Sequence, residues 1–396
     1  MVSLSLPNQL PPAVAESITM VLFDLDGVIT SDLRYFDVAR VTVREMFESE
    51  AYLGLSGYFE IIYPDMPDGG RPGGGIIADT FVSMVKNRAI NSNWDLTYLA
   101  ASLHLGAILT TVYQSTGQDW SSVFNPQNPM QSLHNVSQII SDSIWTEQMG
   151  NDYSNIFFAS AADRNGSDLL SYLEMFLQEQ TGLTNPFFRP GGAFWQFLYR
   201  IFQEWYADTR QSPYALEQRI QLSPEHLIVN ADDLAAMLAR LTHGNRFVLG
   251  IATGRPRAEA LSPLRAHAID TFFDSQRFIT YDDVRAAEAA LSEAGQPTSL
   301  AKPHPFSLLK AITPQASPLT LCAQSGRVTH PEVVYLGDSA SDIVAAQQAG
   351  CIAIGVISSV LHDDKARQAR QQRFVELGCA ALLNTVLDLP QALGWH

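Results

Sequence analysis

The chain has 396 residues, of which 46% are hydrophobic and only 17% are charged. This length exceeds that of the usual single core and predicts two domains, with enough apolar residues for a packed interior. The formal net charge is −16 and no run of Lys or Arg occurs, which argues against nucleic acids and anionic membranes as partners.

Cysteine usage and the N-terminal segment predict a soluble cytoplasmic protein. The three cysteines have no C-x-x-C spacing and are expected to be free thiols in a reducing compartment. The first 20 residues contain no Lys or Arg and are interrupted by three prolines, which is not the pattern of a secretory signal. No apolar run reaches the ~20 residues needed to cross a bilayer, so no membrane association is expected.

The first predicted strand, at residues 19–24, ends in a pair of acids. Asp24 and Asp26 are two positions apart, so on an extended chain they share a face and can reach one ligand. Gly27 follows and lets the backbone turn without a Cβ clash. Because two close carboxylates repel each other, this segment predicts a site that binds a cation.

Residues 31–224 differ in character, since helical periodicity and aromatic residues dominate there. Apolar residues recur at i, i+3 and i+4 in the segments 94–109, 167–180 and 194–206. A loop is predicted for 114–135, which is rich in Gly, Ser, Asn and Pro. The pattern predicts a mainly helical domain inserted after the first strand.

Three features of this segment allow both a functional and a structural interpretation. The Gly-rich stretch 68–75 resembles a phosphate-binding loop, but no Lys-Ser/Thr follows it, and a flexible loop is favoured. Ser92 or Asn93 precedes a helical run and is expected to cap it rather than to contact a sugar. The aromatic cluster at 187–206 is expected to pack in the core rather than to form a ligand wall.

The alternating pattern of strand and helix resumes after residue 225. A predicted helix at 232–241 leads into a strand at 246–252, which is followed by Thr253, Gly254 and Arg255. The Thr253 hydroxyl and nearby backbone N–H groups are suited to hold a phosphate oxygen. Gly254 and Arg255 are further candidates for contact with phosphate or substrate.

Two later segments add a lysine and two more acids. Lys302 precedes a proline and is one of only four lysines in the chain. A predicted strand at 333–337 is followed by Asp338, and Asp342 lies four residues later on the first turn of a predicted helix. Ser339 is expected to cap that helix, although Gly-Asp-Ser also occurs in serine hydrolases. No histidine is assigned a catalytic role.

Further short apolar strands at 278–281, 352–357 and 380–383 complete the alternation of strands and helices. Such alternation predicts an α/β fold with a parallel, doubly wound, Rossmann-like sheet. Active residues of such folds lie at the carboxyl ends of strands, where three of the four motifs fall. The expected domains are a catalytic core, 1–30 with 225–396, and a mainly helical domain, 31–224.

Together and in this order, the four motifs resemble those of the haloacid dehalogenase (HAD) superfamily of phosphotransferases. They are D-x-D-G-V at 24–28, a hydrophobic strand before Thr253, Lys302 before proline, and G-D-S-x-x-D at 337–342. The resemblance covers roughly half of the chain. It implies a HAD-like core and makes residues 31–224 a large cap domain, expected to close over the site and select a small substrate.

The resemblance implies a Mg²⁺-dependent phosphatase that forms an aspartyl-phosphate. Asp24 is the expected nucleophile and Asp26 the general acid and base. Thr253 and Lys302 are expected to hold and neutralise the phosphoryl oxygens. Mg²⁺ prefers oxygen ligands. The expected ligands are Asp24, the carbonyl of Asp26, Asp338 and, as an outer or alternative ligand, Asp342.

Two other functions remain open. Asp26 favours phosphoryl transfer over carbon–halogen cleavage, because a halide leaving group needs no proton. A sugar-phosphate mutase of the β-phosphoglucomutase type shares F-D-L-D-G-V-I-T, although residues 252–256 depart from the serine-and-lysine loop of such mutases. A non-catalytic phosphometabolite-binding protein is an alternative of another class. The expected partner is a small phosphorylated substrate, and the sequence defines neither its identity nor the oligomeric state.

Overall fold

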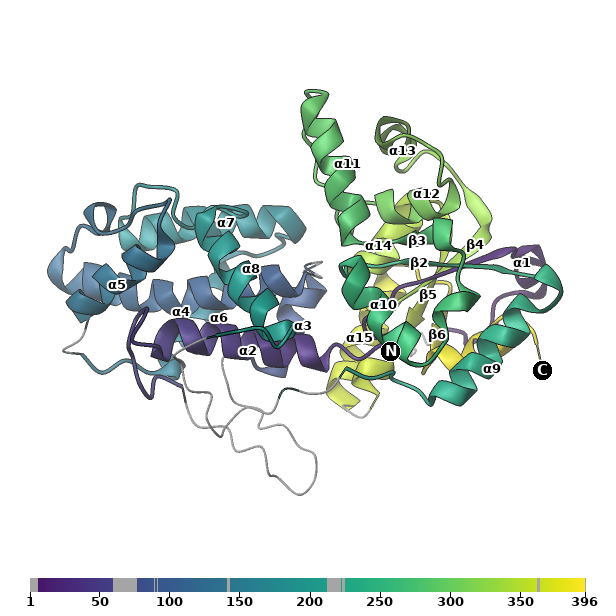
Figure 1. The fold of residues 1–396 in the computed structure, drawn as a ribbon, viewed down its shortest axis with the longest axis horizontal. Coiled ribbons are helices and arrows are strands. Elements are labelled where there is room, and N and C mark those ends of the chain that lie inside the picture. Colours follow the sequence, from purple (N-terminus) through teal and green to yellow (C-terminus); the bar gives the residue numbers. More distant parts are fainter. Residues whose placement is uncertain are drawn as a thin grey trace, which may run out of the picture. The chain divides into compact units, whose positions relative to one another are not determined.

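The computed structural model describes residues 6–59, 77–88, 90, 92–140, 143–211, 222, 225–361 and 364–395. The chain divides into two compact units (Figure 1). The first, called the core below, comprises Met1–Asp32 and Glu225–His396, and the second, called the insertion, comprises Leu33–Pro224. The Gly-rich stretch 68–75, for which a loop is predicted, lies outside the described residues.

The core is built on one six-stranded sheet in which all neighbouring strands are parallel. The order β3-β2-β1-β4-β5-β6 is that of a doubly wound Rossmann-type sheet, so the predicted α/β class is confirmed. The strands are β1 (Met20–Phe23), β2 (Val248–Ala252), β3 (Phe278–Ile279), β4 (His330–Gly337), β5 (Cys351–Val356) and β6 (Ala381–Leu383). Strand β3 is shorter than predicted because Thr280 caps the next helix instead.

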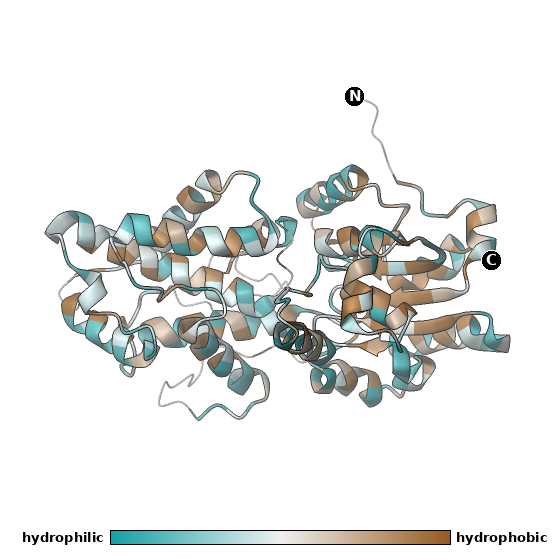
Figure 2. Ribbon diagram, turned by 90° about the horizontal axis from the view of Figure 1, so that it is seen from above, coloured by the Kyte–Doolittle hydropathy of each residue, from teal (hydrophilic) through white to brown (hydrophobic). Residues whose placement is uncertain are grey.

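The central strands are buried on both faces, which explains why they read as continuous apolar runs. In β1, Val21 and Phe23 belong to one hydrophobic cluster and Leu22 to the other. Figure 2 shows the hydrophobic strands, in brown, with helices on both sides. The first face is covered by α1 (Pro12–Ser17), α9 (Ala231–Thr242), α10 (Arg257–Ala266) and α16 (Leu389–Ala392). The second is covered by α11 (Tyr281–Glu293), α12 (Phe306–Ile312), α13 (Pro318–Gln324), α14 (Ala340–Gln348) and α15 (Asp364–Glu376).

Short 3₁₀ helices link several elements of the core. They are η2 (His243–Asn245), η3 (Asp270–Phe272), η4 (Ser275–Arg277), η5 (Ser358–Val360) and η6 (Val386–Asp388). All three cysteines of the core are free, as the sequence predicts, and two of them are buried.

The described part of the insertion contains helices and no strand. Helix α4 (Asn93–Thr116) is central and contacts α2, α6, α7 and α8. The other helices are α2 (Leu33–Glu48), α3 (Asp79–Asn87), η1 (Trp120–Ser122), α5 (Pro129–Ile140), α6 (Glu147–Ser160), α7 (Gly166–Thr181) and α8 (Ala193–Tyr206).

Helix α4 corrects the statement that no apolar run is long enough to cross a membrane. By length and composition alone this 24-residue helix qualifies, because it continues well beyond the predicted segment 94–109. However, 83% of its most apolar window is buried within the structure. Its apolar residues therefore pack against the neighbouring helices, as expected of a core helix.

The prediction of a loop over 114–135 is wrong at both ends, where 114–116 belong to α4 and 129–135 to α5, and holds only for the turns between them. Helix α4 extends to Thr116, and the polar residues that follow form turns and caps: Gly117 adopts φ +71° at the end of α4, and Asn128 accepts from the N–H of Gln131 at the start of α5. Trp120 is fully buried and donates its indole N–H to the carbonyl of Leu109 at 3.0 Å. The segment is thus part of the packed insertion.

Two predictions for the insertion are confirmed. The Ser92 side chain accepts a hydrogen bond from Asp95 N–H at 3.1 Å and caps α4. Phe187, Phe188 and Phe194 are buried and pack against one another, with ring centroids 4.7–5.7 Å apart. These aromatic rings belong to the hydrophobic interior of the insertion.

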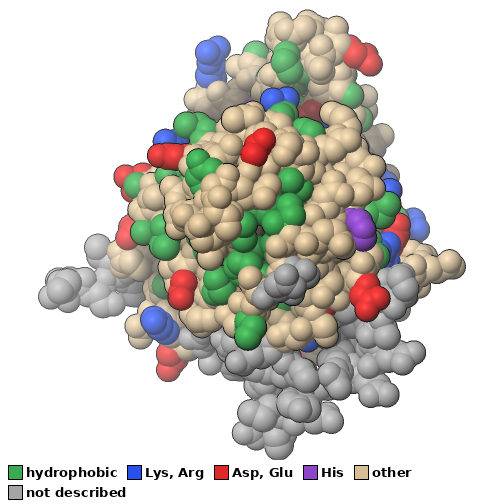
Figure 3. All heavy atoms as spheres, turned by 90° about the vertical axis from the view of Figure 1, so that its left-hand side faces the viewer, with side chains coloured by type: hydrophobic (Ala, Val, Ile, Leu, Met, Phe, Trp, Pro, Cys, Tyr) green, Lys and Arg blue, Asp and Glu red, His purple; other side chains and the backbone are tan. Residues whose placement is uncertain are grey.

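The surface of the insertion also exposes some hydrophobic side chains. Figure 3 shows the face at the left of Figure 1, where hydrophobic side chains lie among charged ones. The most exposed large hydrophobic residues of the insertion are Met130, Ile144, Ile156 and Met175.

Candidate active site

The predicted motifs meet at the carboxyl ends of β1, β2 and β4. Asp24 follows β1 and its N–H bonds the carbonyl of Leu336, so it continues the pairing of β1 with β4. Thr253 follows β2, and Asp338 follows β4. Because β1 lies between β2 and β4, residues separated by more than 200 positions share one edge of the sheet.

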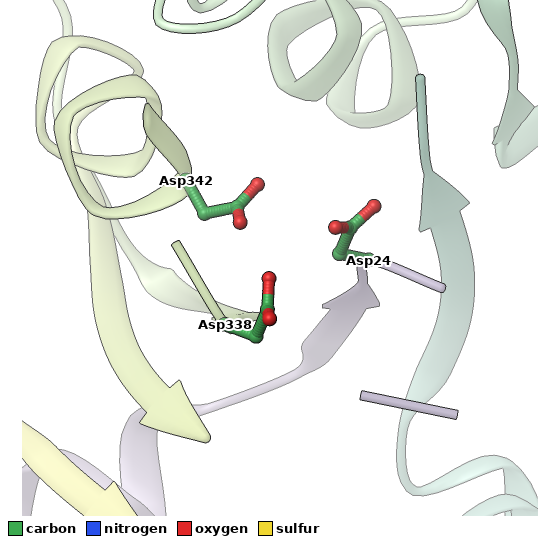
Figure 4. A group of neighbouring side chains, drawn as sticks. All are labelled: Asp24, Asp338 and Asp342. Carbon is green, nitrogen blue, oxygen red and sulfur yellow. The ribbon is translucent and has the colours of Figure 1, made fainter. Parts of the chain in front are cut away.

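Three buried carboxylates form the centre of this site. Asp24, Asp338 and Asp342 each place an oxygen atom within 4.8 Å of the other two (Figure 4). Asp24 and Asp338 follow strand ends, whereas Asp342 projects from the first turn of α14. All three residues are at most 1% exposed. Such a cluster requires compensating positive charge or protonation of one of its carboxyl groups.

Glycines make this close approach of the acids possible. Gly27 has φ +74°, and a Cβ there would overlap the Asp338 carboxylate. A Cβ at Gly337 would overlap the side chain of Asp342. The glycine after the D-x-D pair is therefore needed both for its backbone conformation and for the space it leaves to Asp338.

Lys302, on the segment before α12, supplies a positive charge to this cluster. Its Nζ donates to Asp24 Oδ1 at 3.0 Å, to Asp342 Oδ1 at 2.8 Å and to the Tyr335 hydroxyl at 2.5 Å. Tyr335 in turn donates to the carbonyl of Ala252. The lysine side chain is only 6% exposed, so its position is fixed by these bonds.

Burial and neighbouring charges shift the pKa values of Asp24, Lys302 and Asp342. The pKa of Asp24 is raised to about 8, chiefly by burial and further by the neighbouring carboxylates, although Lys302 opposes the shift. Burial alone would lower the pKa of Lys302, but Asp24 and Asp342 raise it overall. Burial likewise opposes ionisation of Asp342, yet the contact with Lys302 lowers its pKa. Lys302 therefore remains charged and holds Asp342 ionised.

The residues present fit a divalent cation. Asp24 Oδ2 is buried and has no hydrogen-bond partner among the described residues. Lys302 contacts only two of the three clustered carboxylates. All the donor atoms are oxygens, which suits a hard cation such as Mg²⁺. An additional positive charge would favour the ionised form of Asp24.

Asp338 and Asp342 are each held in place by neighbouring side chains. Arg370 on α15 donates to the Asp338 carbonyl at 2.6 Å and to its Oδ2 at 3.0 Å, and Ser359 also donates to Oδ2. Asp342 Oδ2 accepts from the N–H and hydroxyl of Ser339, which caps α14 as predicted. Its Oδ1 contacts Lys302 and Tyr335, so both oxygens of Asp342 have partners within the protein.

Asp26 lies apart from the acid cluster and pairs with Arg255. The guanidinium donates to Asp26 Oδ1 through Nε at 2.8 Å and Nη2 at 2.6 Å. It also forms an ion pair with Glu225. Arg255, predicted to contact phosphate or substrate, is thus engaged by carboxylates in this structure. Thr253 is buried and its Oγ1 accepts from Arg255 N–H, whereas the space beside Gly254 is open.

The sequence analysis missed three residues that organise the site. Tyr335 carries a signal, because it is a polar-tipped residue in the middle of an otherwise apolar strand. Arg370 and Glu225 carry none. Arg370 lies far in sequence from Asp338, and Glu225, which pairs with Arg255, lies in a segment without a motif.

Known proteins resemble this chain in the segments that carry the site. The family model of haloacid dehalogenase-like hydrolases matches residues 198–356. This range includes Thr253, Lys302 and both later acids but not Asp24 and Asp26, which the insertion separates from it. The resemblance to the HAD superfamily is confirmed.

Individual relatives add detail. A phosphoglycolate phosphatase of Mannheimia succiniciproducens is 30% identical over 110 residues, or 28% of this chain and 37% of that protein. The chain thus matches little more than a third of that relative. A crystal structure from the Northeast Structural Genomics Consortium is 25% identical, with a TM-score of 0.63, and the match covers 95% of this chain and 98% of that one. The similarity in fold therefore extends over nearly the whole chain.

A weaker likeness concerns a putative β-phosphoglucomutase from Thermotoga maritima. It is 16% identical and the match covers 94% of this chain and 98% of that one, but the TM-score is only 0.36. A similarity this low carries no weight for fold or activity.

Proposed function

We propose that the protein is a Mg²⁺-dependent phosphomonoester hydrolase that acts on a small phosphorylated metabolite. The observation that carries this proposal is the contact of Lys302 with Asp24 inside a cluster of buried carboxylates, at the edge where three strands end. A buried acid beside a fixed cation is suited to act as a nucleophile toward an anionic phosphoryl group. The cytoplasm is the proposed compartment, in keeping with the three free thiols.

In the proposed mechanism, Asp24 attacks the phosphorus atom and forms an aspartyl-phosphate while the bond to the leaving alcohol breaks. Asp26 protonates the departing oxygen, and the resulting carboxylate then removes a proton from the water that attacks the intermediate. Phosphate leaves and Asp24 is regenerated. Splitting the displacement in this way lowers the barrier of a reaction that is extremely slow in water.

Other residues stabilise charge and fix geometry. Lys302 would neutralise the phosphoryl oxygens while Tyr335 holds its ammonium group in position. Thr253 would donate its hydroxyl to a phosphoryl oxygen. Asp24 and Asp338, with the carbonyl of Asp26, would hold Mg²⁺, and Asp342 would act mainly by positioning Lys302. When bound, Mg²⁺ supplies positive charge to the transferred group.

The phosphoglycolate phosphatase relative supports phosphate release over other HAD chemistries. Because the match covers 37% of that protein, 2-phosphoglycolate is one member of a substrate panel rather than the assigned substrate. The panel should also include sugar phosphates and nucleotide monophosphates. Its preferred members would define what the enzyme selects.

The test is phosphate release from this panel, with and without Mg²⁺, by the wild type and by Asp24→Asn. We expect Mg²⁺-dependent release that the variant loses almost completely, because an amide is not a nucleophile here. Asp232→Asn is the matched control, since this aspartate is exposed on the first turn of α9 and should leave the rate unchanged.

Two outcomes would contradict the proposal. Interconversion of phosphorylated sugars that depends on a bisphosphate activator would identify a mutase. Binding of a phosphorylated metabolite without turnover, retained in Asp24→Asn, would identify a non-catalytic binding protein.

A further inference from the structure

Arg255 occupies a position that the proposed mechanism does not yet use. Its side chain is only 1% exposed, and its guanidinium donates hydrogen bonds to Asp26, Glu225 and the carbonyl of Ser31. Two of its nitrogens, Nε and Nη2, converge on a single oxygen, Asp26 Oδ1. Nη1 bonds Glu225, and Nη2 also bonds the carbonyl of Ser31 at 3.2 Å.

The two acceptors other than Asp26 lie at the junctions between core and insertion. Ser31 is two residues before the insertion begins, and Glu225 is the first residue after it ends. The segments that carry them are paired in antiparallel fashion: Ser31 N–H bonds the carbonyl of His226, and Ile228 N–H bonds that of Ile29. One guanidinium therefore ties the side chain of Asp26 to both of these paired segments.

The backbone around Arg255 is also fixed. Its N–H donates to Thr253 Oγ1 at 3.2 Å, and its carbonyl accepts from Tyr281 N–H at 2.9 Å. The planar fork of an arginine loses little further freedom when it is held in this way, which makes it well suited to orient a carboxylate. A lysine would provide the charge without the fork.

We propose that Arg255 is a positioning residue that orients Asp26 for proton transfer to the leaving group, and that Glu225 and the Ser31 carbonyl hold the guanidinium for this task. This inference rests on the proposed phosphatase function. It replaces the prediction that Arg255 contacts phosphate, because two partly buried carboxylates and a carbonyl already engage the buried guanidinium.

Orientation of Asp26 and contact with the phosphoryl group are two different roles for Arg255. They predict that the loss of activity in an Arg255 variant depends differently on the leaving group of the ester. Proton donation contributes about 10²–10⁴-fold to a reaction that needs it. An alkoxide is a poor leaving group and needs the proton, whereas p-nitrophenolate leaves readily without one. A contact to the phosphoryl group itself would matter equally for both kinds of ester. The parameter to compare is kcat/KM, because it reports the steps up to the first release of alcohol and not the later hydrolysis of the intermediate.

The experiment measures kcat/KM for p-nitrophenyl phosphate and for the best alkyl phosphate of the substrate panel. For Arg255→Met we expect a loss of about 30-fold or more with the alkyl ester, because a misoriented Asp26 forfeits part of the contribution of general acid catalysis. With the nitrophenyl ester we expect a loss of less than about threefold. Asp26→Asn should show the same selectivity more strongly, and Arg255→Lys should recover little, because it lacks the fork.

Three comparisons keep the test independent of folding. Glu225→Ala leaves Arg255 and Asp26 in place and removes only one support of the guanidinium, so we expect a smaller loss, again confined to the alkyl ester. Arg257→Met is the matched control, because this neighbouring arginine is 41% exposed and pairs with Asp283 outside the site. Lys302→Met should reduce kcat/KM for both esters alike.

The outcomes separate the inference from the proposed function. If the wild type releases phosphate from no ester, the proposed function is wrong. If the wild type is active but Arg255→Met and Glu225→Ala reduce kcat/KM equally for both esters, the positioning role is wrong and a phosphate contact or a purely structural role stands. A selective loss with the alkyl ester in both variants supports the inference.

Discussion

The core and the insertion both bury charged groups, but they arrange them differently. In the core, Asp24, Asp338, Asp342 and Lys302 converge at one edge of the sheet, and Asp24 Oδ2 is left without a partner among the described residues. In the insertion, the buried Glu45 on α2 pairs with Arg210, 165 residues later in the sequence, at 2.5 Å.

Buried charge joins two segments in the insertion, whereas in the core it forms a cluster of like charges. The ion pair in the insertion joins its first helix to the segment after its last one, and Trp205 also donates its indole N–H to Glu45. The core cluster instead accumulates like charges around a small volume, which raises the pKa of Asp24 to about 8, chiefly through its burial. Strong perturbation of clustered groups is typical of functional sites. The contrast predicts that changes in the core impair turnover, whereas changes in the insertion impair stability.

The largest effect is expected from Lys302→Met. Loss of the ammonium removes the cation that opposes protonation of Asp24 and that would neutralise the phosphoryl oxygens. We expect kcat/KM to fall by about 10³-fold, in the range observed when a preorganised electrostatic group is removed. The measurement is phosphate release at saturating Mg²⁺, with circular dichroism as a check on folding.

The control for this variant is Lys310→Met. Lys310 donates to the carbonyls of Pro314 and Ala316, outside the acid cluster, and its loss should leave kcat/KM within about twofold of the wild type. If kcat/KM falls by less than tenfold in Lys302→Met, the electrostatic role assigned to this lysine is wrong.

The next effect concerns the insertion and is expected from Arg210→Met. Removing Arg210 takes away the guanidinium charge that pairs with the buried Glu45, so the free energy of unfolding should fall by about 3 kcal/mol. Five of the six tryptophans lie in the insertion, so denaturant unfolding followed by tryptophan fluorescence reports on this unit. Phosphate release at 25 °C should change by less than about threefold.

Arg189→Met is the matched control, because Arg189 is 65% exposed and lies 4.0 Å from Glu174. Exposed pairs of this kind contribute at most about 1 kcal/mol. Equal losses of stability in Arg210→Met and Arg189→Met would show that the buried ion pair stabilises the insertion no more than the exposed one.

A smaller effect is expected at the boundary of the acid cluster from Arg370→Gln. Arg370 holds both the carbonyl and one carboxylate oxygen of Asp338, so it orients this candidate ligand. Loss of such outer contacts weakens metal binding by about 10–100-fold. Titration calorimetry of Mg²⁺ binding should show this loss, and Arg373→Gln, which pairs with Glu376 on the same helix, should not. Tighter binding in Arg370→Gln would mean that the arginine competes with the cation.

Much of the core could be predicted from the sequence because its signals are local. Apolar runs mark the strands, and the acids and the hydroxyl that follow them mark the strand ends at Asp24, Thr253 and Asp338. A parallel sheet then gathers these ends at one edge without any need to know the distances. Helix caps such as Ser92 and Ser339 are likewise specified by residues three positions away.

The remaining features depend on partners that are distant in the sequence. Nothing near Arg255 shows that Glu225 and Asp26 lie beside it, so its place after Thr253 suggested a phosphate contact. Tyr335 is fixed by Lys302 and Ala252, which belong to other elements. The same reason explains why the loop predicted over 114–135 is wrong at its ends. The polar composition of this segment gives no sign that Trp120 is buried. Tertiary contacts outweigh local composition in each case.

The smallest effect tests whether a buried titratable residue in the insertion has a purely structural role. His104 on α4 is fully buried, its Nδ1 lies 3.2 Å from the Tyr58 hydroxyl, and its Nε2 has no partner among the described residues. Burial lowers the pKa of His104 from 6.5 to about 3. The folded protein therefore keeps this imidazole neutral, whereas the unfolded chain binds a proton below pH 6.5.

The sign of the pH dependence follows from this difference. The contribution of His104 to stability is fully present above pH 6.5 and is lost as the pH falls from 6.5 toward 3, by about 1.4 kcal/mol per pH unit. Denaturant unfolding at pH 7.5, 6.5 and 5.5 should show a shallower decline in His104→Asn than in the wild type, while the exposed His134→Asn should decline like the wild type. Because acid titration of carboxylates is common to all three proteins, only the difference between them reports on His104. Parallel curves for wild type and His104→Asn would show that this histidine is protonated in the folded insertion, and the contrast between an electrostatic site in the core and a neutral interior in the insertion would no longer hold.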